Sequence, residues 1–386
     1  MVTGILHTLD ILLWLFVAGS VLYVFFFALS SLLPERTRKD VTTQTHQSKF
    51  LVLFPAYHED KVIVNSVEQF LQQSYPQEKF QVVVISDHML PETNQQLSTF
   101  PITLLTPVFE KSSKAKAMQY AISQVDETFD AVVVLDADNV VAPDFLTRLD
   151  LLCQAGYSVI QCHRCAKNAD NDIAVLDGVS EEINNTLFRK AHNRIGLSSA
   201  LIGSGMCFQY NLFKKNVFNL KTAGEDREME ALLLSQEVFI KYASDIHVFD
   251  EKVSSQDNFQ RQRMRWMTAQ VQSLLSMLPH IPNAIRKGNI NYIDKTIQQA
   301  LIPRSILIIV VTLFTILLTI FVPTWSIKWW TLLCVLTVSL FIAIPSRLRL
   351  RSISKVFAIP SLTIQMLGNI FHINKNNTDF IHTTHG

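Results

Sequence analysis

Hydrophobic and polar positions divide the chain into an apolar start, a mixed central part and an apolar end. Residues 11–33 are almost wholly apolar, and a stretch of this length spans a lipid bilayer. Two more apolar stretches, residues 306–322 and 329–344, are joined by a short connection and predict a membrane hairpin. Residues 356–371 are apolar but contain a proline, a glutamine and an asparagine. We expect them to form an interfacial or re-entrant helix, with a full span as the alternative.

The central part alternates between short apolar runs and stretches with helical spacing. The predicted strands are residues 50–54, 80–85, 102–105, 131–135 and 157–162. The predicted helices are residues 62–73, 113–123, 173–192, 225–234 and 259–277. Strands that alternate with helices form a parallel sheet covered by helices, so the sequence predicts a doubly wound α/β domain. Residues 274–300 mix apolar and polar positions and are expected at the membrane surface.

This pattern divides the chain into five parts. They are a transmembrane helix (1–34), an α/β domain (48–270), interfacial helices (271–304), a transmembrane hairpin (305–345) and an interfacial or re-entrant helix with a tail (346–386). Arg36, Arg38 and Lys39 follow the first apolar stretch, and further basic residues follow the hairpin. Because Lys and Arg are enriched in cytoplasmic loops, we predict a multi-pass protein of the cell (inner) membrane, with a cytoplasmic α/β domain and membrane lipids as partners.

Composition excludes some classes of protein. The net charge of the 386-residue chain is +1, which argues against a nucleic-acid partner because no broad basic surface is implied. Five cysteines do not suggest a disulfide framework. Cys162 and Cys165 flank His163 in a single C-x-x-C, and no second pair follows at zinc-finger spacing. Reduced, partly buried thiols are therefore expected here rather than a metal site.

Two carboxylates follow the predicted strand at residues 131–135. Asp136 and Asp138 are two positions apart, so on an extended chain their side chains point the same way and can share one target. Ligands bind at the carboxyl ends of strands in open α/β sheets. Two carboxylates suit Mg²⁺ or Mn²⁺ held between the protein and a diphosphate. The alternative is a strand end closed by solvated aspartates.

Five further segments occur in a fixed order with this D-x-D. The six segments are residues 54–59, Asp87, residues 113–117, 136–138, 224–226 and the Q-x-x-R-W at 262–266. Together they resemble the motifs of membrane-bound family 2 glycosyltransferases of the GT-A fold, related to cellulose and hyaluronan synthases. The resemblance implies a Rossmann-like, mostly parallel sheet, and a nucleotide-diphosphate sugar, first of all a UDP-linked one, as donor. It implies transfer of a hexosyl or N-acetylhexosaminyl group to a saccharide or lipid-linked acceptor.

The resemblance also assigns roles to single residues. It implies that Asp138 and Asp136 bind the metal and that Asp226 is the catalytic base. The nucleotide-sugar site would contain Pro55, Ala56, Tyr57, Glu59, Asp87, Lys114, Asp136, Gln262, Arg265 and Trp266. The acceptor site would contain Gly203, Gly205, Glu225 and Trp266.

The chemistry of glycosyl transfer agrees with these residue types. A divalent ion at Asp138 neutralises charge that develops on the departing diphosphate, and Lys114 and Arg265 add fixed positive charge. Asp226 would take the proton of an acceptor hydroxyl that attacks the anomeric carbon, which gives a single displacement with inversion. Gly203 and Gly205 lack side chains and would leave room for a sugar. For the basic segment around residues 260–266 the alternative is an amphipathic helix on the membrane surface.

The chain departs from the family pattern at two positions. Ser113 replaces a glycine, which makes close backbone approach to the phosphates less certain, and Gly224 stands where threonine is common. Neither change removes a charged catalytic group. His163 and Arg164 line the acceptor site or form a hydrogen-bonded structural pair; the sequence leaves both interpretations open.

The C-terminal tail, residues 380–386, resembles the F-x-V-T-x-K gating loop of cellulose synthases. Phe380, Thr383 and His385 stand in the matching places, with His382 in place of Val and His385 in place of Lys. Such a loop closes over bound nucleotide and excludes water. Plain disorder, which is common at termini, is the alternative.

Two other functions compete with glycosyl transfer. A glycoside hydrolase also uses two carboxylates, but the cytoplasmic topology and the predicted cations favour a nucleotide sugar. A catalytically inactive, membrane-anchored module that binds sugar nucleotides would be expected to have lost Asp138 or Asp226, and this chain retains both.

Overall fold

An eight-stranded sheet forms the centre of the α/β part and positions the residues discussed above. We describe it from a computed structural model, which covers residues 2–35, 47–168, 172–222, 224–252, 256–346 and 348–349. The strand order is β3-β2-β1-β4-β7-β6-β8-β5. The strands are β1 (Phe50–Tyr57), β2 (Phe80–Asp87), β3 (Thr103–Leu105), β4 (Ala131–Val134), β5 (Val140–Val141), β6 (Val159–Ala166), β7 (Met206–Gln209) and β8 (Lys241–Asp250).

The sheet is mostly parallel, as the sequence predicted. β1 pairs in parallel with β2 and β4, β2 with β3, and β6 with β8. β7 runs antiparallel between β4 and β6, and β5 runs antiparallel to β8. The apolar runs predicted β1, β2, β4 and β6, because buried parallel strands are hydrophobic on both faces. They did not predict β8, in which buried and exposed residues alternate along much of the strand.

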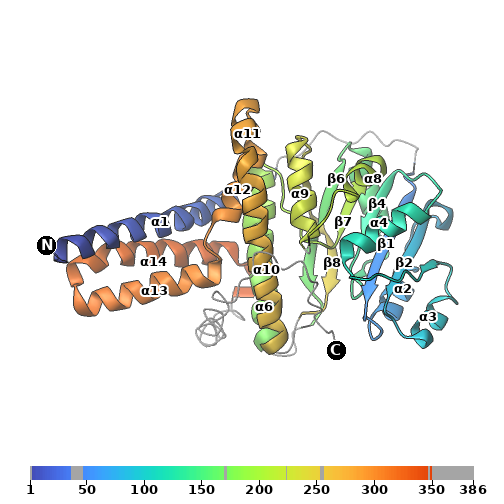
Figure 1. Cartoon of the computed structure of the whole chain (residues 1–386), viewed down its shortest axis with the longest axis horizontal. Helices are drawn as coiled ribbons and strands as arrows, with labels where there is room; N and C mark the ends of the chain where they lie inside the picture. Colours follow the sequence, from blue (N-terminus) through green and yellow to red (C-terminus); the bar gives the residue numbers. More distant parts are fainter. Residues whose placement is uncertain are drawn as a thin grey trace.

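Helices cover both faces of this sheet (Figure 1). The helices of the α/β part are α2 (Ile63–Phe70), α3 (Pro91–Leu97), α4 (Lys114–Gln124), α5 (Phe145–Gln154), α8 (Tyr210–Val217), α9 (Glu225–Ser235) and the short η1 (Gln77–Lys79). One core cluster joins the sheet to α4, α8 and α9, and a second joins the opposite face to α2 and α5. Phe54 and Phe208 are at most 1% exposed, and burying such a side chain contributes about 1.5–3 kcal/mol.

A second group of helices lies between the α/β part and the long apolar helices (Figure 1). They are α6 (Asp172–Asn184), α7 (Ala191–Ile195), α10 (Gln256–Met277), α11 (Ile281–Lys287), α12 (Ile290–Ala300), the π-helical η2 (Asn185–Lys190) and η3 (Leu278–His280). The single helix predicted over residues 173–192 is thus interrupted by a wider π-helical turn. Single π turns of this kind are often found at functional sites.

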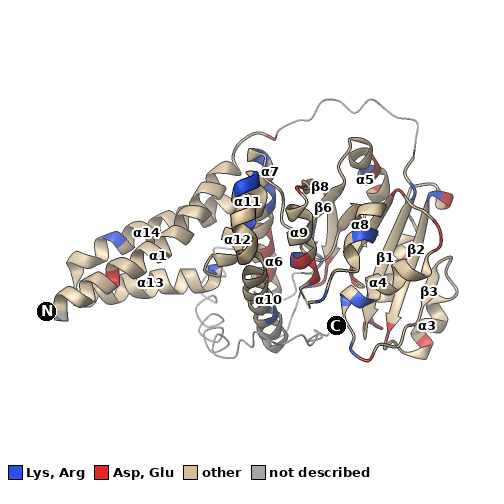
Figure 2. Ribbon diagram, turned by 45° about the horizontal axis from the view of Figure 1, so that its top comes forward, with Lys and Arg blue, Asp and Glu red and all other residues tan. Residues whose placement is uncertain are grey.

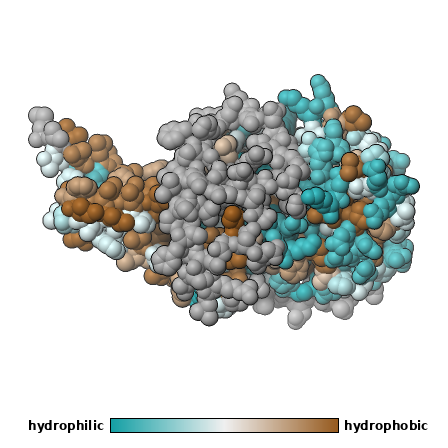
Figure 3. Space-filling view, turned by 90° about the horizontal axis from the view of Figure 1, so that it is seen from below, coloured by the Kyte–Doolittle hydropathy of each residue, from teal (hydrophilic) through white to brown (hydrophobic). Residues whose placement is uncertain are grey.

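Three long helices extend away from the α/β part (Figure 1). They are α1 (Val2–Ser30), α13 (Arg304–Phe321) and α14 (Pro323–Ala343), and each is long and apolar enough to cross a membrane. Phe16 and Ile320 are 64% and 66% exposed, so apolar side chains point outward from this bundle. Figure 3 shows the same contrast: the helical extension is largely hydrophobic, and the far end of the α/β part is largely hydrophilic.

Charged residues are sparse on the three long helices and common on the rest of the molecule (Figure 2). An exception is an ion pair between Asp10 on α1 and Lys328 on α14, where Trp329 Nε1 also donates to Asp10 Oδ1 at 2.8 Å. Ionisable groups inside such bundles are usually paired, because an unpaired charge in an apolar region is costly. The pair therefore fixes α14 against α1.

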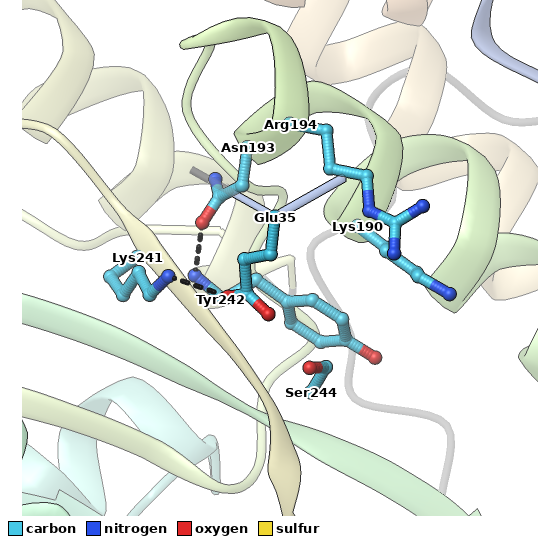
Figure 4. A pocket seen from close by; sticks show the side chains of 7 residues that line it. All are labelled: Glu35, Lys190, Asn193, Arg194, Lys241, Tyr242 and Ser244. Atoms are coloured by element: carbon cyan, nitrogen blue, oxygen red, sulfur yellow. Dashed lines mark hydrogen bonds and ion pairs between the residues drawn. The ribbon is translucent and has the colours of Figure 1, made fainter. Parts of the chain in front are cut away.

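A small polar pocket lies where α1 meets the α/β part (Figure 4). Lys241 Nζ forms an ion pair with Glu35 Oε1 at 3.0 Å, which ties the chain after α1 to β8. Lys190 and Arg194 approach from the other side, and Arg194 Nη1 donates to the carbonyl of Ser31. This pocket contains none of the site residues predicted from the sequence.

Candidate active site

The carboxyl ends of β1, β2 and β4 meet at one edge of the sheet. Tyr57 at the end of β1 is in register with Asp87 at the end of β2. Asp136 and Asp138 follow β4, which pairs with the other side of β1. Since parallel strands point the same way, three predicted segments from distant parts of the chain share this edge.

The geometry of the D-x-D differs from the prediction. β4 ends at Val134, and Asp136 lies in a turn rather than on an extended strand. The side chain of Asn139 closes this turn: its Oδ1 accepts from the backbone N–H of Asp136 at 2.9 Å. The premise of an extended chain therefore does not hold here, because the strand ends at Val134 and a turn begins at Asp136.

The two aspartates have different partners. Asp136 forms an ion pair with Lys114 at the start of α4. Asp138 is 5% exposed; its Oδ1 accepts from Asn139 Nδ2 at 3.0 Å and its Oδ2 from the backbone N–H of Glu251 at 2.7 Å. Asp138 therefore lies between the turn of the D-x-D and the end of β8.

Several carboxylates gather around Asp138. Burial, followed by the charges of Asp138, Asp136 and Glu251, raises the pKa of Glu59 from 4.5 to about 8. Burial is the largest cause of this shift, and the neighbouring carboxylates add to it; a divalent cation bound among them would reduce their repulsion. Carboxylate oxygens are also the donors that Mg²⁺ and Mn²⁺ prefer, so these residues fit the predicted metal.

Lys114 connects the D-x-D to the segment with the predicted catalytic base. Its Nζ donates to the carbonyl of Gly203 at 2.7 Å in addition to its ion pair with Asp136. Burial lowers the pKa of Lys114, but the carboxylates of Asp136 and Glu225 outweigh this effect and raise the pKa above its ordinary value. Burial raises the pKa of Glu225, with Lys114 opposing and Asp226 adding to the shift. These charges thus act on one another across three separate segments.

The start of α9 presents Glu225 and Asp226 to the same region. A Cβ placed on Gly203, whose φ is +81°, would lie 3.7 Å from Asp226 Oδ2 and 3.8 Å from Glu225 Oε1. The backbone of Gly203 therefore lies directly beside both carboxylates. Asp226 Oδ1 also accepts from the backbone N–H of Arg227 at 2.8 Å, which fixes its orientation at the first turn.

The two predicted acceptor glycines differ in their surroundings. A Cβ on Gly205, whose φ is +62°, would lie only 2.9 Å from Val248 Cγ2 and 3.3 Å from Cys162 Cβ. The sequence predicted that Gly205 leaves room for a sugar, but side chains of β8 and β6 fill that space. Gly205 is required by its left-handed backbone and by the close approach of Val248.

Aromatic rings surround the edge at β1 and β2. The Tyr57 ring lies 4.5 Å from the ring of His58 and 5.7 Å from that of His88. Asp87 is 3% exposed, and its Oδ1 lies at hydrogen-bond distance, 2.6 Å, from His88 Nδ1. Pro55 and Tyr57 are partly exposed on β1, whereas Ala56 is buried in the core. This edge can contact a flat ring, with Asp87 beside it.

The Q-x-x-R-W segment lies on α10. Gln262 Oε1 is buried and has no hydrogen-bond partner among the described residues, so it can accept a hydrogen bond from a ligand. Arg263 donates to Asp177 Oδ1 on α6 at 2.7 Å, and its guanidinium lies 4.6 Å from the Trp266 ring centre. One face of Trp266 is thus covered by Arg263, and Arg265 is half-buried nearby on the same helix. The segment therefore joins α10 to α6.

Departures from the family pattern have local explanations. Ser113 is the N-cap of α4: its Oγ accepts from the backbone N–H of Lys116 at 3.2 Å, and its φ of −157° does not require glycine. A Cβ on Gly224 would lie 2.9 Å from the Cβ of Ala269 on α10. Glycine at residue 224 therefore lets α9 and α10 approach closely.

His163 and Arg164 on β6 lie in a buried network of charged and hydrogen-bonding side chains. The Arg164 guanidinium forms an ion pair with Glu181 on α6 at 2.9 Å, and Arg189 binds the same carboxylate at 3.1 Å. Burial raises the pKa of Glu181, but the two arginines outweigh this effect and hold the pKa well below its ordinary value. His163 Nδ1 lies 2.5 Å from Tyr242 Oη. Both residues thus belong to a buried hydrogen-bonded network, as the second interpretation expected.

Sequence reasoning missed four residues of the site: His58, His88, Asn139 and Glu251. Asn139 directly follows the D-x-D and His88 follows Asp87, so adjacency was the available signal for both. Glu251 gave no signal, because it lies 113 residues from Asp138 and follows a strand that was not predicted. Phe380, Thr383 and His385, together with residues 356–371, lie outside the described residues.

Comparison with known sequences identifies a family pattern. The profile described as "Glycosyltransferase like family 2" matches residues 46–269, more than half of the 386-residue chain. No curated protein matches the chain in sequence at a significant level.

Solved structures share the fold at low sequence identity. The mannosyltransferase PcManGT from Pyrobaculum calidifontis, solved with GDP-Man and Mn²⁺, has a TM-score of 0.54 and 16% identity, covering 84% of this chain and 95% of its own. S. aureus TarS 1-349 has a TM-score of 0.44 at 15% identity, covering 83% and 88%. Glucosyl-3-phosphoglycerate synthase from Mycobacterium tuberculosis has 0.42 at 14% identity, covering 63% and 83%. Of these three, PcManGT supports the shared fold, so the predicted GT-A-type α/β fold is confirmed.

Proposed function

This chain belongs to glycosyltransferase-like family 2, and from that premise we propose that it transfers a sugar from a nucleotide-diphosphate sugar with inversion at the anomeric carbon. The observation that carries this proposal is the convergence at Lys114. One ammonium group contacts Asp136 of the D-x-D and the carbonyl of Gly203, and it senses the charges of Glu225 and Asp226. A cation for phosphate, two candidate metal ligands and a candidate base are thereby brought to one edge of the sheet.

Each group has a role in the proposed reaction. Asp226 takes the proton of the acceptor hydroxyl while that oxygen forms a bond to the anomeric carbon. The bond from that carbon to the diphosphate breaks, and the nucleoside diphosphate leaves with the electron pair. Lys114 and Arg265 place positive charge near the leaving group. A bound Mg²⁺ or Mn²⁺, held by Asp138 with Asp136, would neutralise the charge that develops on the diphosphate.

The donor is proposed to bind along β1 and β2. The rings of Tyr57, His58 and His88 provide flat surfaces for a nucleobase, and Asp87 can accept a hydrogen bond from its edge. A UDP-linked hexose or N-acetylhexosamine is the first candidate. GDP-mannose is tested beside it, because PcManGT was solved with GDP-Man and has a similar fold.

The acceptor is proposed to be a saccharide or a lipid-linked saccharide at the cytoplasmic membrane face. Three helices apolar enough to cross a membrane adjoin the α/β part, and α10 and α12 lie between them and the sheet (Figure 1). A lipid-linked acceptor in that membrane would be held close to the α/β part.

A donor panel with one matched pair of variants tests this function. Membranes containing the protein are offered radiolabelled nucleotide sugars with Mn²⁺ or Mg²⁺, and transferred label is measured. Asp138→Asn should abolish transfer and weaken nucleotide binding in metal-containing buffer, while the fold is kept. Asp144→Asn, the same change at an exposed aspartate, should leave transfer unchanged. Nucleotide-sugar binding without transfer or hydrolysis of any donor would favour the inactive binding module instead.

A further inference from the structure

Potential metal ligands meet where β6 pairs with β8, apart from the carboxylates of the candidate active site. His163 and Cys165 lie on β6 and His247 on β8, and one ligand atom from each falls within 4.8 Å of the other two. β6 and β8 are parallel with His163 in register with His247. Because residues two apart on a strand point to the same face, all three side chains can face one point.

The sequence paired Cys165 with Cys162, and the structure separates them. The register of β6 against β8 shifts between Cys162 and His163. Cys162 is 1% exposed, belongs to the apolar core and lies beside Gly205. In the structure the neighbour of Cys165 is His247 and not Cys162. The C-x-x-C motif alone would therefore predict a different set of ligands.

Hydrogen bonds hold the ring of His163 in this group. Its Nδ1 lies 2.5 Å from Tyr242 Oη, and its Nε2 lies 3.2 Å from Glu182 Oε1 on α6. A histidine that binds a metal keeps such a bond at one nitrogen, which orients the ring, and gives up the bond at the other.

We propose that His163, Cys165 and His247 bind a zinc ion. Two imidazoles and a thiolate form a ligand set suited to Zn²⁺, with water as the fourth ligand, whereas Mg²⁺ prefers oxygen ligands alone. Binding converts the Cys165 thiol to a thiolate and releases its proton to solvent. The site thus differs in ligand chemistry from the carboxylate cluster at Asp138.

The ion would join two strands that adjoin the candidate active site. It would link β6 to β8, and the backbone N–H of Glu251, directly after β8, donates to Asp138 Oδ2. Zinc would therefore help to hold the end of β8 at the D-x-D. Its presence can be measured without any transfer assay, so the outcome does not depend on the proposed function.

The direct test is metal analysis of the full-length protein purified in detergent. After loading with zinc and dialysis against buffer without metal, wild-type protein should retain about one zinc ion per chain. Cys165→Ser and His247→Gln should retain less than about a tenth of that amount. Cys162→Ser, a neighbouring buried cysteine, and Asp138→Asn, in the other cluster, should retain the wild-type amount. Wild-type protein without retained zinc, or Cys165→Ser with the full amount, would overturn the proposal.

A spectroscopic measurement on wild-type protein tests the proposal even if the variants fail to fold. X-ray absorption of the zinc-loaded protein should show one sulfur ligand at about 2.3 Å together with nitrogen and oxygen ligands. Cobalt-loaded wild-type and Cys162→Ser proteins should both show thiolate-to-cobalt charge-transfer absorption. A metal shell of nitrogen and oxygen alone would contradict the proposed role of Cys165.

Discussion

Asp226 and Lys114 illustrate how single residues acquire their role from distant partners. Lys114 lies at the start of α4, yet its contacts are Asp136 after β4 and the carbonyl of Gly203 before β7. Asp226 is placed against Gly203 by the first turn of α9. Each of these groups is exposed to the charge of the others, so substitutions here are expected to alter chemistry more than folding.

Loss of the proposed base should separate binding from turnover. Asp226→Asn keeps the size and the hydrogen bond from Arg227 but cannot take a proton, so transfer should fall by at least about a hundredfold. Donor affinity, measured by nucleotide-sugar titration in Mn²⁺, should stay close to that of wild type. A variant that loses donor affinity and turnover together would make Asp226 a binding or structural residue.

Glu59 should make the stability of the metal-free protein depend on pH. Its folded pKa is raised from 4.5 to about 8, so its contribution to stability is fully present below pH 4.5 and is lost as the pH rises through about 8. In EDTA, wild-type protein should therefore lose more thermal stability over this range than Glu59→Gln does. Glu92→Gln, at an exposed position, serves as the control and should follow wild type. Parallel dependence of thermal stability on pH for wild type and Glu59→Gln would show that the pKa of Glu59 is not raised in the folded protein.

At the scale of elements, α9 and α10 meet at a contact that explains one departure from the family pattern. Gly224 begins α9 and faces Ala269 on α10, and an added methyl group would lie 2.9 Å from the Ala269 Cβ. Such crowding displaces helices at a typical cost of about 1–3 kcal/mol. The spacing of these helices also sets where Asp226 lies relative to Gln262.

A pair of substitutions tests this helix contact. Gly224→Ala should lower thermal stability and slow transfer, because α9 must move away from α10. Adding Ala269→Gly in the same protein should restore both, since it removes the opposing methyl group. Ala269→Gly alone is the control for the lower helix propensity of glycine. Unchanged stability of Gly224→Ala, or no recovery in the double variant, would show that the contact does not set the helix spacing.

For the whole molecule, the arrangement of the three long helices predicts the side on which the α/β part lies. The chain leaves α1 next to β8, where Glu35 pairs with Lys241, and returns to the membrane at α13. The turn between α13 and α14 lies at the far end of the bundle, near the start of α1 (Figure 1). With basic residues following α1, the α/β part is expected in the cytoplasm and this turn outside.

Cysteine labelling in intact cells tests this orientation. Val108 is 93% exposed on the α/β part, so Val108→Cys should be protected from a membrane-impermeant thiol reagent until the cells are opened. Thr324→Cys, at the turn between α13 and α14, should react in intact cells. Both changes are made in a Cys334→Ser background, because Cys334 is exposed on α14. Labelling of Val108→Cys from outside would reverse the orientation and remove access to cytoplasmic nucleotide sugars.

The sequence by itself determined the features that depend on local pattern. Apolar length marked α1, α13 and α14, and short apolar runs marked the inner strands β1, β2 and β4. The order of the motifs along the chain located the D-x-D and the Q-x-x-R-W. These features are local because burial of a strand or a membrane helix constrains consecutive residues.

Only the tertiary structure decided which residues meet. In the folded protein the Glu251 backbone donates to Asp138, and Val248 fills the space beside Gly205. Cys162 and Cys165 lie in different surroundings. The tertiary structure also brought His247 to His163 through the register of β6 and β8. Such contacts depend on strand order, on a shift in strand register and on helix spacing, and no local window of sequence contains that information.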